Sequence, residues 1–466
     1  MLFSSVPFLF YFLPVVVILY FLCPQKLKNT VLLLASLFFY AWGEGKLVLL
    51  FAATILLGWA LSLPMEKLRG TIWAKLLLIL SVGIDLALLG YFKYMDFFLA
   101  GFNRAFGASV PLLHVALPIG ISFYTFQILS YTVDVYRGQV LAQRNVIDFA
   151  TYVALFPQLI AGPIVRYADV AEQLKTRRYT IQGAAEGIRR FVIGLGKKVL
   201  IANLMGELCA TFRATTAPSV LYYWIYAVAY LFQIYFDFSG YSDMAIGLGR
   251  LFGFCFPENF NYPYISKSIT EFWRRWHISL GTWFRDYVYI PLGGNRKGKQ
   301  RQIFNILVVW ILTGLWHGAA WNFVLWGLLY AVLLMVEKLF LKSWLDRHPV
   351  CGHIYTLAFV LFGFVLFNAT DLAGVGADLR GMFAFGSLPL VSTESLYYLR
   401  SYAAVFVLAI FGCTPLPKRV VAEIAGRRWG ERVLSVAEPL VLLAIFLIVT
   451  AFLVDGSFNP FLYFRF

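Results

Sequence analysis

The sequence predicts an all-α protein that crosses a membrane many times, and three observations support this class. Of its 466 residues, 61% are apolar and only 14% are charged, whereas soluble domains average roughly 45–50% apolar and about a quarter charged. The mean hydropathy of the whole chain is +0.75. The apolar residues also gather in runs long enough to span a bilayer. The composition therefore excludes both a soluble enzyme with a single anchor and a disordered chain.

Counting the apolar runs gives the expected number of crossings. A spanning helix needs about 20 mostly apolar residues, and the runs predict roughly 11–12 transmembrane helices. The expected crossings are Val6–Leu22, Thr30–Trp42, Leu47–Leu63, Ala74–Phe92, Leu112–Tyr131, Ile188–Leu208, Val220–Phe238, Ile303–Gly318, Trp321–Leu341, Ile354–Phe367, Tyr402–Cys413 and Leu434–Val454.

Two regions do not fit simple crossings. Phe149–Gly162 is apolar but short and ends in Ala-Gly-Pro, which predicts a re-entrant segment or a broken helix. Leu251–Asn295 is a long aromatic and basic stretch, too hydrophobic for an ordinary loop, and is expected to hold an interfacial helix. Irregular backbone at membrane depth is tolerated only when it is buried in protein or lines a wet cavity. Both regions therefore indicate a polar interior site.

The charge balance indicates orientation in the membrane. The chain has 39 Lys and Arg against 24 Asp and Glu, a net charge of +15. The basic residues lie in clusters between apolar runs, which favours loops on the cytoplasmic face over a nucleic-acid surface. The first charge, Lys26, follows the first apolar run, so we expect an N-terminus outside the membrane. The five cysteines form no CxxC pair, and no metal site is expected.

His317 is the strongest candidate for chemistry. It lies 16 residues beyond Arg301, which corresponds to about 24 Å along a helix and places it deep in the membrane. Gly314 and Gly318 flank it and permit close approach of a ligand or of backbone. The alternative is a structural histidine that bonds across helices. The residues expected to line a pocket around it are Trp316, Gly318 and Asn322.

His277 is the second candidate and has two interpretations. On a helix, Trp273, His277, Leu280 and Phe284 share one face, which predicts an amphipathic interfacial helix. The histidine is then either a structural group in an anchor or part of the entrance for a charged donor. In the second case nearby arginines would pair with phosphates. The candidate donor-binding residues are Arg274, Arg275, Trp276 and Arg285.

Several motifs from residue 117 to the end of the chain resemble the membrane-bound O-acyltransferase family. The resemblance is to the branch that contains the membrane subunit of bacterial alginate O-acetylation. The motifs are Leu117–Phe126, Phe156–Pro163, Arg274–Tyr287, Ile290–Arg296, Leu315–Gly318 and the tail Asn459–Phe466.

The resemblance implies a fold and a set of roles. It implies one integral-membrane domain over residues 1–466 that forms a funnel, with N-terminal helices in 1–110, a motif-bearing core in 111–330 and C-terminal helices in 331–466. It also implies that His317 is the essential intramembrane histidine and His277 the second characteristic polar residue. The donor would be a cytosolic acyl-coenzyme A, and the acceptor would be presented on the other side of the membrane.

These observations lead to a functional hypothesis. His317 would act as a general base while an acetyl group passes from acetyl-CoA towards O-acetylation of an extracytoplasmic, alginate-like polysaccharide. The resemblance implies a serine esterase-like acetyltransferase outside the membrane as the direct partner, with the polysaccharide engaged indirectly. No permanently bound cofactor and no nucleic acid is expected. The alternatives are a transporter or flippase for a polysaccharide precursor and a non-catalytic scaffold of an export complex.

Overall fold

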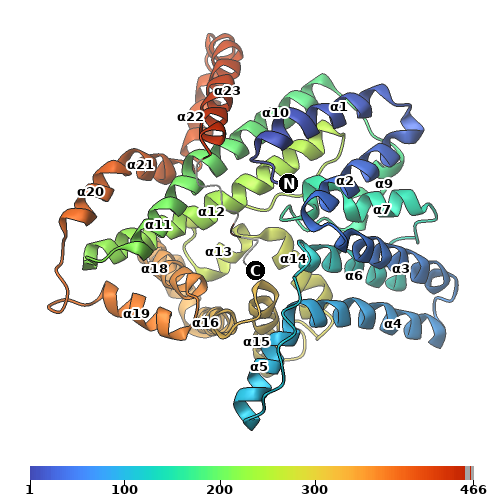
Figure 1. The fold of residues 1–466 in the computed structure, drawn as a ribbon, viewed down its shortest axis with the longest axis horizontal. Coiled ribbons are helices and arrows are strands. Elements are labelled where there is room, and N and C mark those ends of the chain that lie inside the picture. Colours follow the sequence, from blue (N-terminus) through green and yellow to red (C-terminus); the bar gives the residue numbers. More distant parts are fainter. Residues whose placement is uncertain (457–461, 463–466) are drawn as a thin grey trace. The chain divides into compact units, whose positions relative to one another are not determined.

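The computed structural model describes residues 1–456 and 462, and its regular structure is helical (Figure 1). The only extended pairing among these residues is an isolated bridge between Phe385 and Leu388. The chain forms two compact units, which are residues 1–191 with 244–257, and residues 192–243 with 258–466. The all-α class predicted from the sequence is confirmed, while the single-domain organisation stays a prediction.

The first unit contains α6 (Ile121–Arg137), in which every residue from Ile121 to Thr132 is buried. Helices α3, α4 and α7 contact it. The segments of this unit are η1 (Phe8–Phe12), α1 (Leu13–Leu22), η2 (Gln25–Leu27), α2 (Lys28–Glu44), α3 (Leu47–Lys67), α4 (Ile72–Leu89), η3 (Gly90–Tyr94), α5 (Met95–Phe106), α7 (Val146–Ala154), α8 (Phe156–Leu159) and α9 (Tyr167–Lys175).

Two predictions fall in this unit. The crossing expected from Leu112 is wrong in its first part, because residues 112–120 are not helical and α6 begins only at Ile121. Pro118 and the left-handed Gly120 (φ 75°) explain the late start, since neither suits the interior of a helix. Of the two alternatives predicted for Phe149–Gly162, a re-entrant segment or a broken helix, the structure shows a break in the helix, because Leu155 is not helical (φ −52°, ψ 110°) between α7 and α8.

The second unit carries the histidines of interest. Its segments are η4 (Lys197–Asn203), α11 (Leu204–Ala214), η5 (Pro263–Ile265), α13 (Ile269–Arg275), α14 (Ile278–Phe284), η6 (Arg285–Tyr289), α15 (Lys299–His317), α16 (Trp321–Val336), η7 (Glu337–Leu341), α17 (Lys342–Arg347), α18 (Pro349–Asn368), α19 (Leu372–Met382), α20 (Thr393–Ser401), α21 (Ala403–Gly412), α22 (Leu416–Ala425) and α23 (Gly430–Val454). Helices α10 (Ile181–Gly196) and α12 (Val220–Leu251) each contribute residues to both units.

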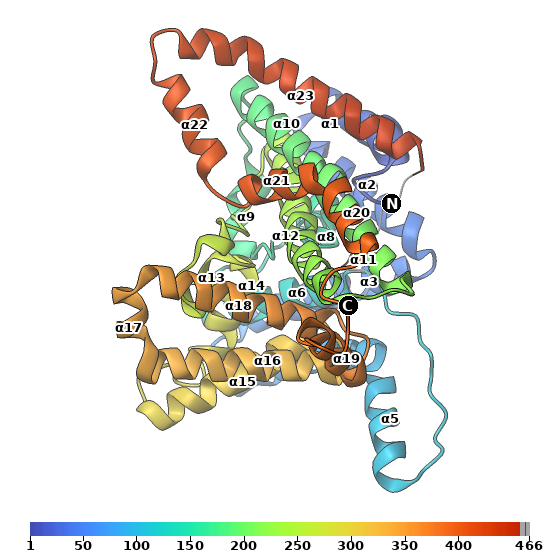
Figure 2. The ribbon, with the colours of Figure 1, turned by 90° about the vertical axis from the view of Figure 1, so that its left-hand side faces the viewer.

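Helices α15 and α16 lie side by side, and α18 packs against α16 (Figure 2). Glycines bring the first two backbones together. A Cβ atom on Gly314 would clash with the carbonyl oxygen of Phe323, and one on Gly327 would clash with the carbonyl oxygen of Trp310. Any larger side chain at either position would push the helices apart. This contact fixes the end of α15 against the start of α16.

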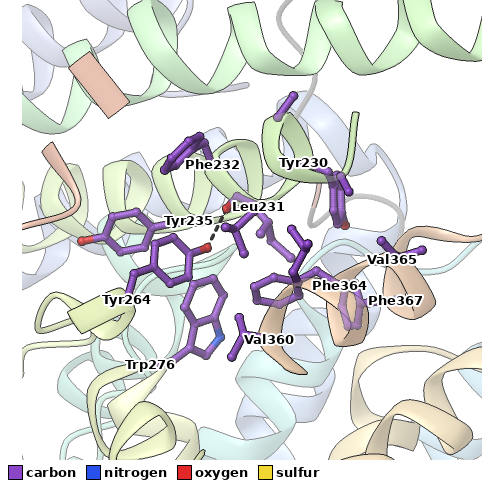
Figure 3. Packing of buried hydrophobic residues seen from close by; sticks show 14 of the residues in the cluster. Tyr230, Leu231, Phe232, Tyr235, Tyr264, Trp276, Val360, Phe364, Val365 and Phe367 are labelled. Atoms are coloured by element: carbon purple, nitrogen blue, oxygen red, sulfur yellow. Dashed lines mark hydrogen bonds between the residues drawn. The ribbon is translucent and has the colours of Figure 1, made fainter. Parts of the chain in front are cut away.

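An aromatic core fills the second unit around Trp276 (Figure 3). The indole of Trp276 stacks on Phe272 with ring centroids 5.5 Å apart and contacts Phe364 at 5.2 Å. Beside it, the hydroxyl of Tyr264 donates a hydrogen bond to the backbone oxygen of Leu231. Aromatic residues make up much of this core, so their bulk sets the width of any cavity within it.

The helices support a multi-pass membrane protein. Within the part of the chain that the structure describes, five helices are long and apolar enough to cross a bilayer, and a bent pair, Thr393–Ser401 with Ala403–Gly412, would make a sixth. The other predicted crossings fall on shorter or more polar helices; α15, for example, begins with Lys299 and Arg301. The count of 11–12 therefore stays a prediction. The five are Leu47–Lys67, Ile72–Phe106, Trp321–Arg347, Pro349–Asn368 and Gly430–Val454.

Candidate active site

His317 is the last residue of α15 and is 5% exposed. Its Nδ1 atom lies 2.7 Å from the backbone oxygen of Thr313, one turn earlier in the same helix. A carbonyl oxygen only accepts hydrogen bonds, so Nδ1 carries the proton and Nε2 is the basic nitrogen of the neutral ring. The helix itself therefore selects the tautomer that is suited to accept a proton.

Aromatic rings surround the imidazole of His317. Its ring centroid lies 5.0 Å from that of Trp326 and 5.4 Å from that of Phe367. Gly318 follows at the end of the helix, and the ring of Phe323 lies where a side chain on Gly318 would be. The flanking glycines were predicted to permit close approach of a ligand or of backbone. In the structure the groups that approach them belong to the protein: the backbone of α16 at Gly314 and the aromatic ring of Phe323 at Gly318.

His277 lies at a break between α13 and α14, in a left-handed conformation (φ 46°, ψ 53°). The prediction of one continuous amphipathic helix through this residue is therefore wrong. The ring is 2% exposed and packs edge-on against Phe238, with centroids 4.7 Å apart. Its Nε2 atom has no hydrogen-bond partner among the described residues. A left-handed non-glycine residue at a buried polar site is a strained arrangement that marks a functional candidate.

Asn259 holds this break in place. Its side-chain oxygen lies 3.1 Å from Nδ1 of His277 and accepts hydrogen bonds from the backbone amide and the hydroxyl of Ser279. Its side-chain nitrogen donates to the hydroxyl of Ser242. The amide oxygen of Asn259 thus caps the N-terminus of α14 and also orients the imidazole of His277. Burial, and to a smaller extent His317, lowers the pKa of His277 well below its usual range.

The two imidazoles belong to one neighbourhood. The indole of Trp316 lies between them, with ring centroids 5.8 Å from His277 and 5.0 Å from His317. Phe238, which packs on His277, also lines a cavity that contains His317. The structure therefore brings together two histidines that lie 40 positions apart in the sequence.

The cavity beside His317 is small. The space open to the centre of a water molecule is about 10 Å³, which is room for roughly one water. Most of its wall is aromatic, and its polar groups come from Asp237 and His317. The lining residues are Ile234, Asp237, Phe238, Trp276, His317, Trp326, Phe364, Phe367 and Leu462.

A buried ion pair forms part of this wall. Oδ1 of Asp237 lies 2.6 Å from Nζ of Lys198, and both side chains are almost fully buried. Oδ2 of Asp237 accepts a hydrogen bond from the backbone amide of Leu462. Lys198 is carried by η4, a π-helical segment, and such segments often occur at functional sites. Leu462 is the one described residue of the motif Asn459–Phe466, whose other members lie outside the described residues.

The predicted donor-binding residues lie in different settings. Arg275 pairs with Glu271, and Arg285 pairs with Asp286. Arg274 is exposed, and its side chain makes no ion pair or hydrogen bond with the described residues. Trp276 is instead buried and lines the cavity. Among the three arginines, Arg274 is therefore the one whose guanidinium is available to an incoming anion.

The predicted pocket residues also differ from one another. Trp316 contacts both histidines, as described above. Asn322 is buried and donates hydrogen bonds to the backbone oxygens of Phe367 and Ala369, so it fastens the start of α16 to the end of α18. Trp321, at the first position of α16, is 55% exposed and turns away from the cavity.

Sequence reasoning missed several residues that build the site. Asn259, Lys198 and Phe367 come from three separate segments and have no shared motif. One feature of the sequence pointed to Asn259: it is a polar residue within Leu251–Asn295, the stretch that is too hydrophobic for an ordinary loop and was expected to contribute to a polar interior site. Asp237 lies among aromatic residues in the sequence, but spacing does not reveal its partner, Lys198.

Comparison with known proteins identifies the family to which the chain belongs. The sequence model of the family described as MBOAT, membrane-bound O-acyltransferase family, matches residues 111–374. Probable alginate O-acetylase AlgI of Pseudomonas putida is 42% identical over the full length of both chains. Peptidoglycan O-acetyltransferase of Helicobacter pylori is 35% identical over 86% of this chain and 83% of its own length. Teichoic acid D-alanyltransferase of Bacillus subtilis is 31% identical over 54% of this chain and 68% of its own length.

The matched region includes both histidines, Asn259 and most of the residues that line the cavity. The prediction of an O-acyltransferase is confirmed at the level of the reaction class, against the transporter and scaffold alternatives. The chain belongs to the membrane-bound O-acyltransferase family.

Proposed function

We propose that this O-acyltransferase takes an acetyl group from acetyl-CoA on the cytoplasmic side and delivers it across a bacterial cytoplasmic membrane. The group would serve O-acetylation of an extracytoplasmic polysaccharide that resembles alginate. The names of two kinds of relative that match most of this chain, alginate O-acetylase and peptidoglycan O-acetyltransferase, support acetyl transfer to a glycan. The observation that carries the proposal is the buried His317, with a basic Nε2 beside a cavity.

The reaction assigns His317 the role of general base. Nε2 accepts the proton of an acceptor hydroxyl while the hydroxyl oxygen attacks the thioester carbonyl carbon. A new C–O bond forms, the C–S bond breaks, and the leaving thiolate takes the proton back from the imidazolium. Coenzyme A leaves as a thiol, so protons balance within the site and no further reactant is needed. The hydrogen bond from Nδ1 to the oxygen of Thr313 stabilises the imidazolium that forms midway.

The size of the cavity favours a small acyl group. Room for roughly one water molecule beside His317 is less than an acetyl group needs, so the walls must move for any donor, and a longer acyl chain requires a larger movement. Trp276, Trp326 and Phe367 are held by contacts with other rings, so such movement is restricted. These walls support acetyl as the transferred group.

The donor and the partner complete the proposal. Arg274, exposed and unpaired among the described residues, is the proposed contact for the phosphates of acetyl-CoA. A serine esterase-like acetyltransferase outside the membrane is the proposed recipient of the acetyl group, which it would pass to the polysaccharide. The orientation rests on the basic clusters between apolar runs, with the N-terminus outside.

The proposal is tested with the purified full-length protein in detergent or nanodiscs. Acetyl-CoA labelled in the acetyl group is added with an acceptor hydroxyl, and thiol release and transferred label are both measured. We expect His317→Ala to lower the rate by about 10²–10⁴-fold, the usual contribution of a general base. His348→Ala, at an exposed histidine in the same unit, is the matched control. Full activity in a folded His317→Ala protein would overturn the assignment.

A further inference from the structure

Two buried cations in the first unit are not used by the acyl transfer proposed above. Lys28, the first residue of α2, is 7% exposed, and Arg177, which follows α9, is 9% exposed. Buried charges are normally paired with an opposite charge, because taking an isolated ion out of water is costly. Neither side chain forms an ion pair with any of the described residues.

Aromatic rings hold both cations close together. The ammonium of Lys28 lies 4.1 Å from the ring centroid of Tyr179 and 4.7 Å from that of Tyr20. The guanidinium carbon of Arg177 lies 4.5 Å from the ring of Phe254 and 5.8 Å from the same Tyr20 ring. Both cations thus contact the ring of Tyr20. The aromatic rings stabilise each cation but supply no negative charge.

The hydrogen bonds of Arg177 leave one of its three guanidinium nitrogens without a partner among the described residues. Its Nη2 donates to the side-chain oxygen of Asn29 and its Nε donates to the hydroxyl of Tyr179. Its Nη1 is buried and has no hydrogen-bond partner among the described residues. The nearest carboxylate in this network, Asp148, is bonded to the amide nitrogen of Asn29 rather than to either cation. The cluster therefore carries two positive charges against one indirect negative charge.

Apolar side chains at the edge of the cluster of Lys28 and Arg177 indicate where an anion that balances its charge would come from. Phe21, whose ring centroid is 5.4 Å from the ammonium of Lys28, is 45% exposed. Leu22 and Leu27, on either side of the turn that leads to Lys28, are also exposed. In a multi-pass membrane protein, exposed side chains of this kind contact lipid. The cations thus lie where the end of an apolar helix meets the headgroup layer.

We propose that Lys28 and Arg177 form a binding site for the phosphate of a membrane phospholipid. Nη1 of Arg177 would donate to a phosphate oxygen, and the ammonium of Lys28 would supply the second charge. The acyl chains would lie along Phe21 and Leu22. The shared chemistry is a phosphate group, which a soluble phosphate also offers, and the lipid is favoured by the apolar edge. The site is independent of the acyl-transfer chemistry proposed above.

The test uses full-length protein that has been stripped of lipid in a non-ionic detergent. Its melting temperature is measured with phosphatidylglycerol, with diacylglycerol of the same acyl chains, and with inorganic phosphate. We expect phosphatidylglycerol well above its Kd to raise the melting temperature by about 2–8 °C, and diacylglycerol to have no effect. Stabilisation by inorganic phosphate alone would overturn the lipid source. Equal effects of both lipids would overturn the phosphate site.

Matched variants locate the effect. Arg177→Gln and Lys28→Gln should each reduce the shift caused by phosphatidylglycerol, while Arg178→Gln and Lys26→Gln, at exposed neighbours, should retain it. If Arg177→Gln fails to fold, Lys28→Gln still tests the site. Native mass spectrometry of the unstripped wild type gives a second measurement. Retained phospholipid is expected, and equal retention by wild type and a folded Lys28→Gln protein would overturn the proposal.

Discussion

The end of α15 and the break between α13 and α14 both hold a buried histidine, but they hold it in different ways. At His317 the Nδ1 proton is donated to a backbone oxygen of the same helix, four residues earlier. At His277 it is paired with the side chain of Asn259, 18 residues earlier in an irregular segment. The first arrangement needs only a backbone oxygen of the helix that carries His317, whereas the second depends on the side chain of a distant residue, Asn259. A ring positioned by backbone is therefore robust to mutation of its acceptor, and a ring positioned by a side chain is not.

The largest expected effect comes from removing the side-chain acceptor of His277, compared with a substitution that leaves the backbone acceptor of His317 in place. Asn259→Ala leaves Nδ1 of His277 and two groups of Ser279 without a partner in the interior, and we expect a loss of about 3–5 kcal/mol of stability. Thr313→Val keeps the backbone oxygen that His317 uses and should cost less than about 1.5 kcal/mol. Both are measured as the free energy of unfolding in detergent. Equal losses would contradict the difference between the two regions.

The second prediction concerns the cavity that belongs to the His317 region. Phe367→Ala removes a ring from its wall, and the preference for acetyl-CoA over butyryl-CoA should fall about 10–200-fold, the range for small changes of acyl size in an apolar pocket. Phe284→Ala in α14 is the control, because Phe284 is buried but does not line the cavity. The measurement is the ratio of kcat/KM for the two donors. An unchanged ratio in Phe367→Ala would contradict size selection by this wall.

The difference between the two histidine regions also explains which of their features the sequence could predict. The position of His317 at the far end of a helix from Arg301 follows from counting residues, because α15 is one unbroken helix; its depth in the membrane stays a prediction. The all-α class likewise follows from composition. The break at His277 was missed because the apolar spacing of Trp273, Leu280 and Phe284 fits a helix, whereas the break is stabilised by Asn259 from outside the segment. The pair of Lys198 and Asp237 was missed for the same reason, since contacts between distant segments leave no periodicity.

The third prediction compares a glycine from each region. Gly314→Ala places a methyl group against the backbone of α16, and we expect a loss of about 1–3 kcal/mol together with reduced activity, because the end of α15 would shift. Gly281→Ala in α14 meets only an ordinary contact, 3.8 Å from the oxygen of Trp273, and should be neutral or slightly stabilising. Melting temperature and acetyl transfer are measured for both proteins. A stable, active Gly314→Ala protein would show that the helices do not depend on this contact.

The smallest expected effect is a pH dependence that belongs to the His277 region alone. Because burial lowers the pKa of His277 in the folded protein, the unfolded chain takes up a proton below pH about 6.5 that the folded protein does not. Stability should therefore fall on acidification, by about 1 kcal/mol between pH 7 and 5.5, and recover as the pH rises. His277→Gln should lack this component, so the difference in melting temperature between wild type and variant should shrink as the pH falls. A difference that stays constant would mean that the ring is protonated in the folded protein, and Nε2 would then need an acceptor that the described residues do not supply.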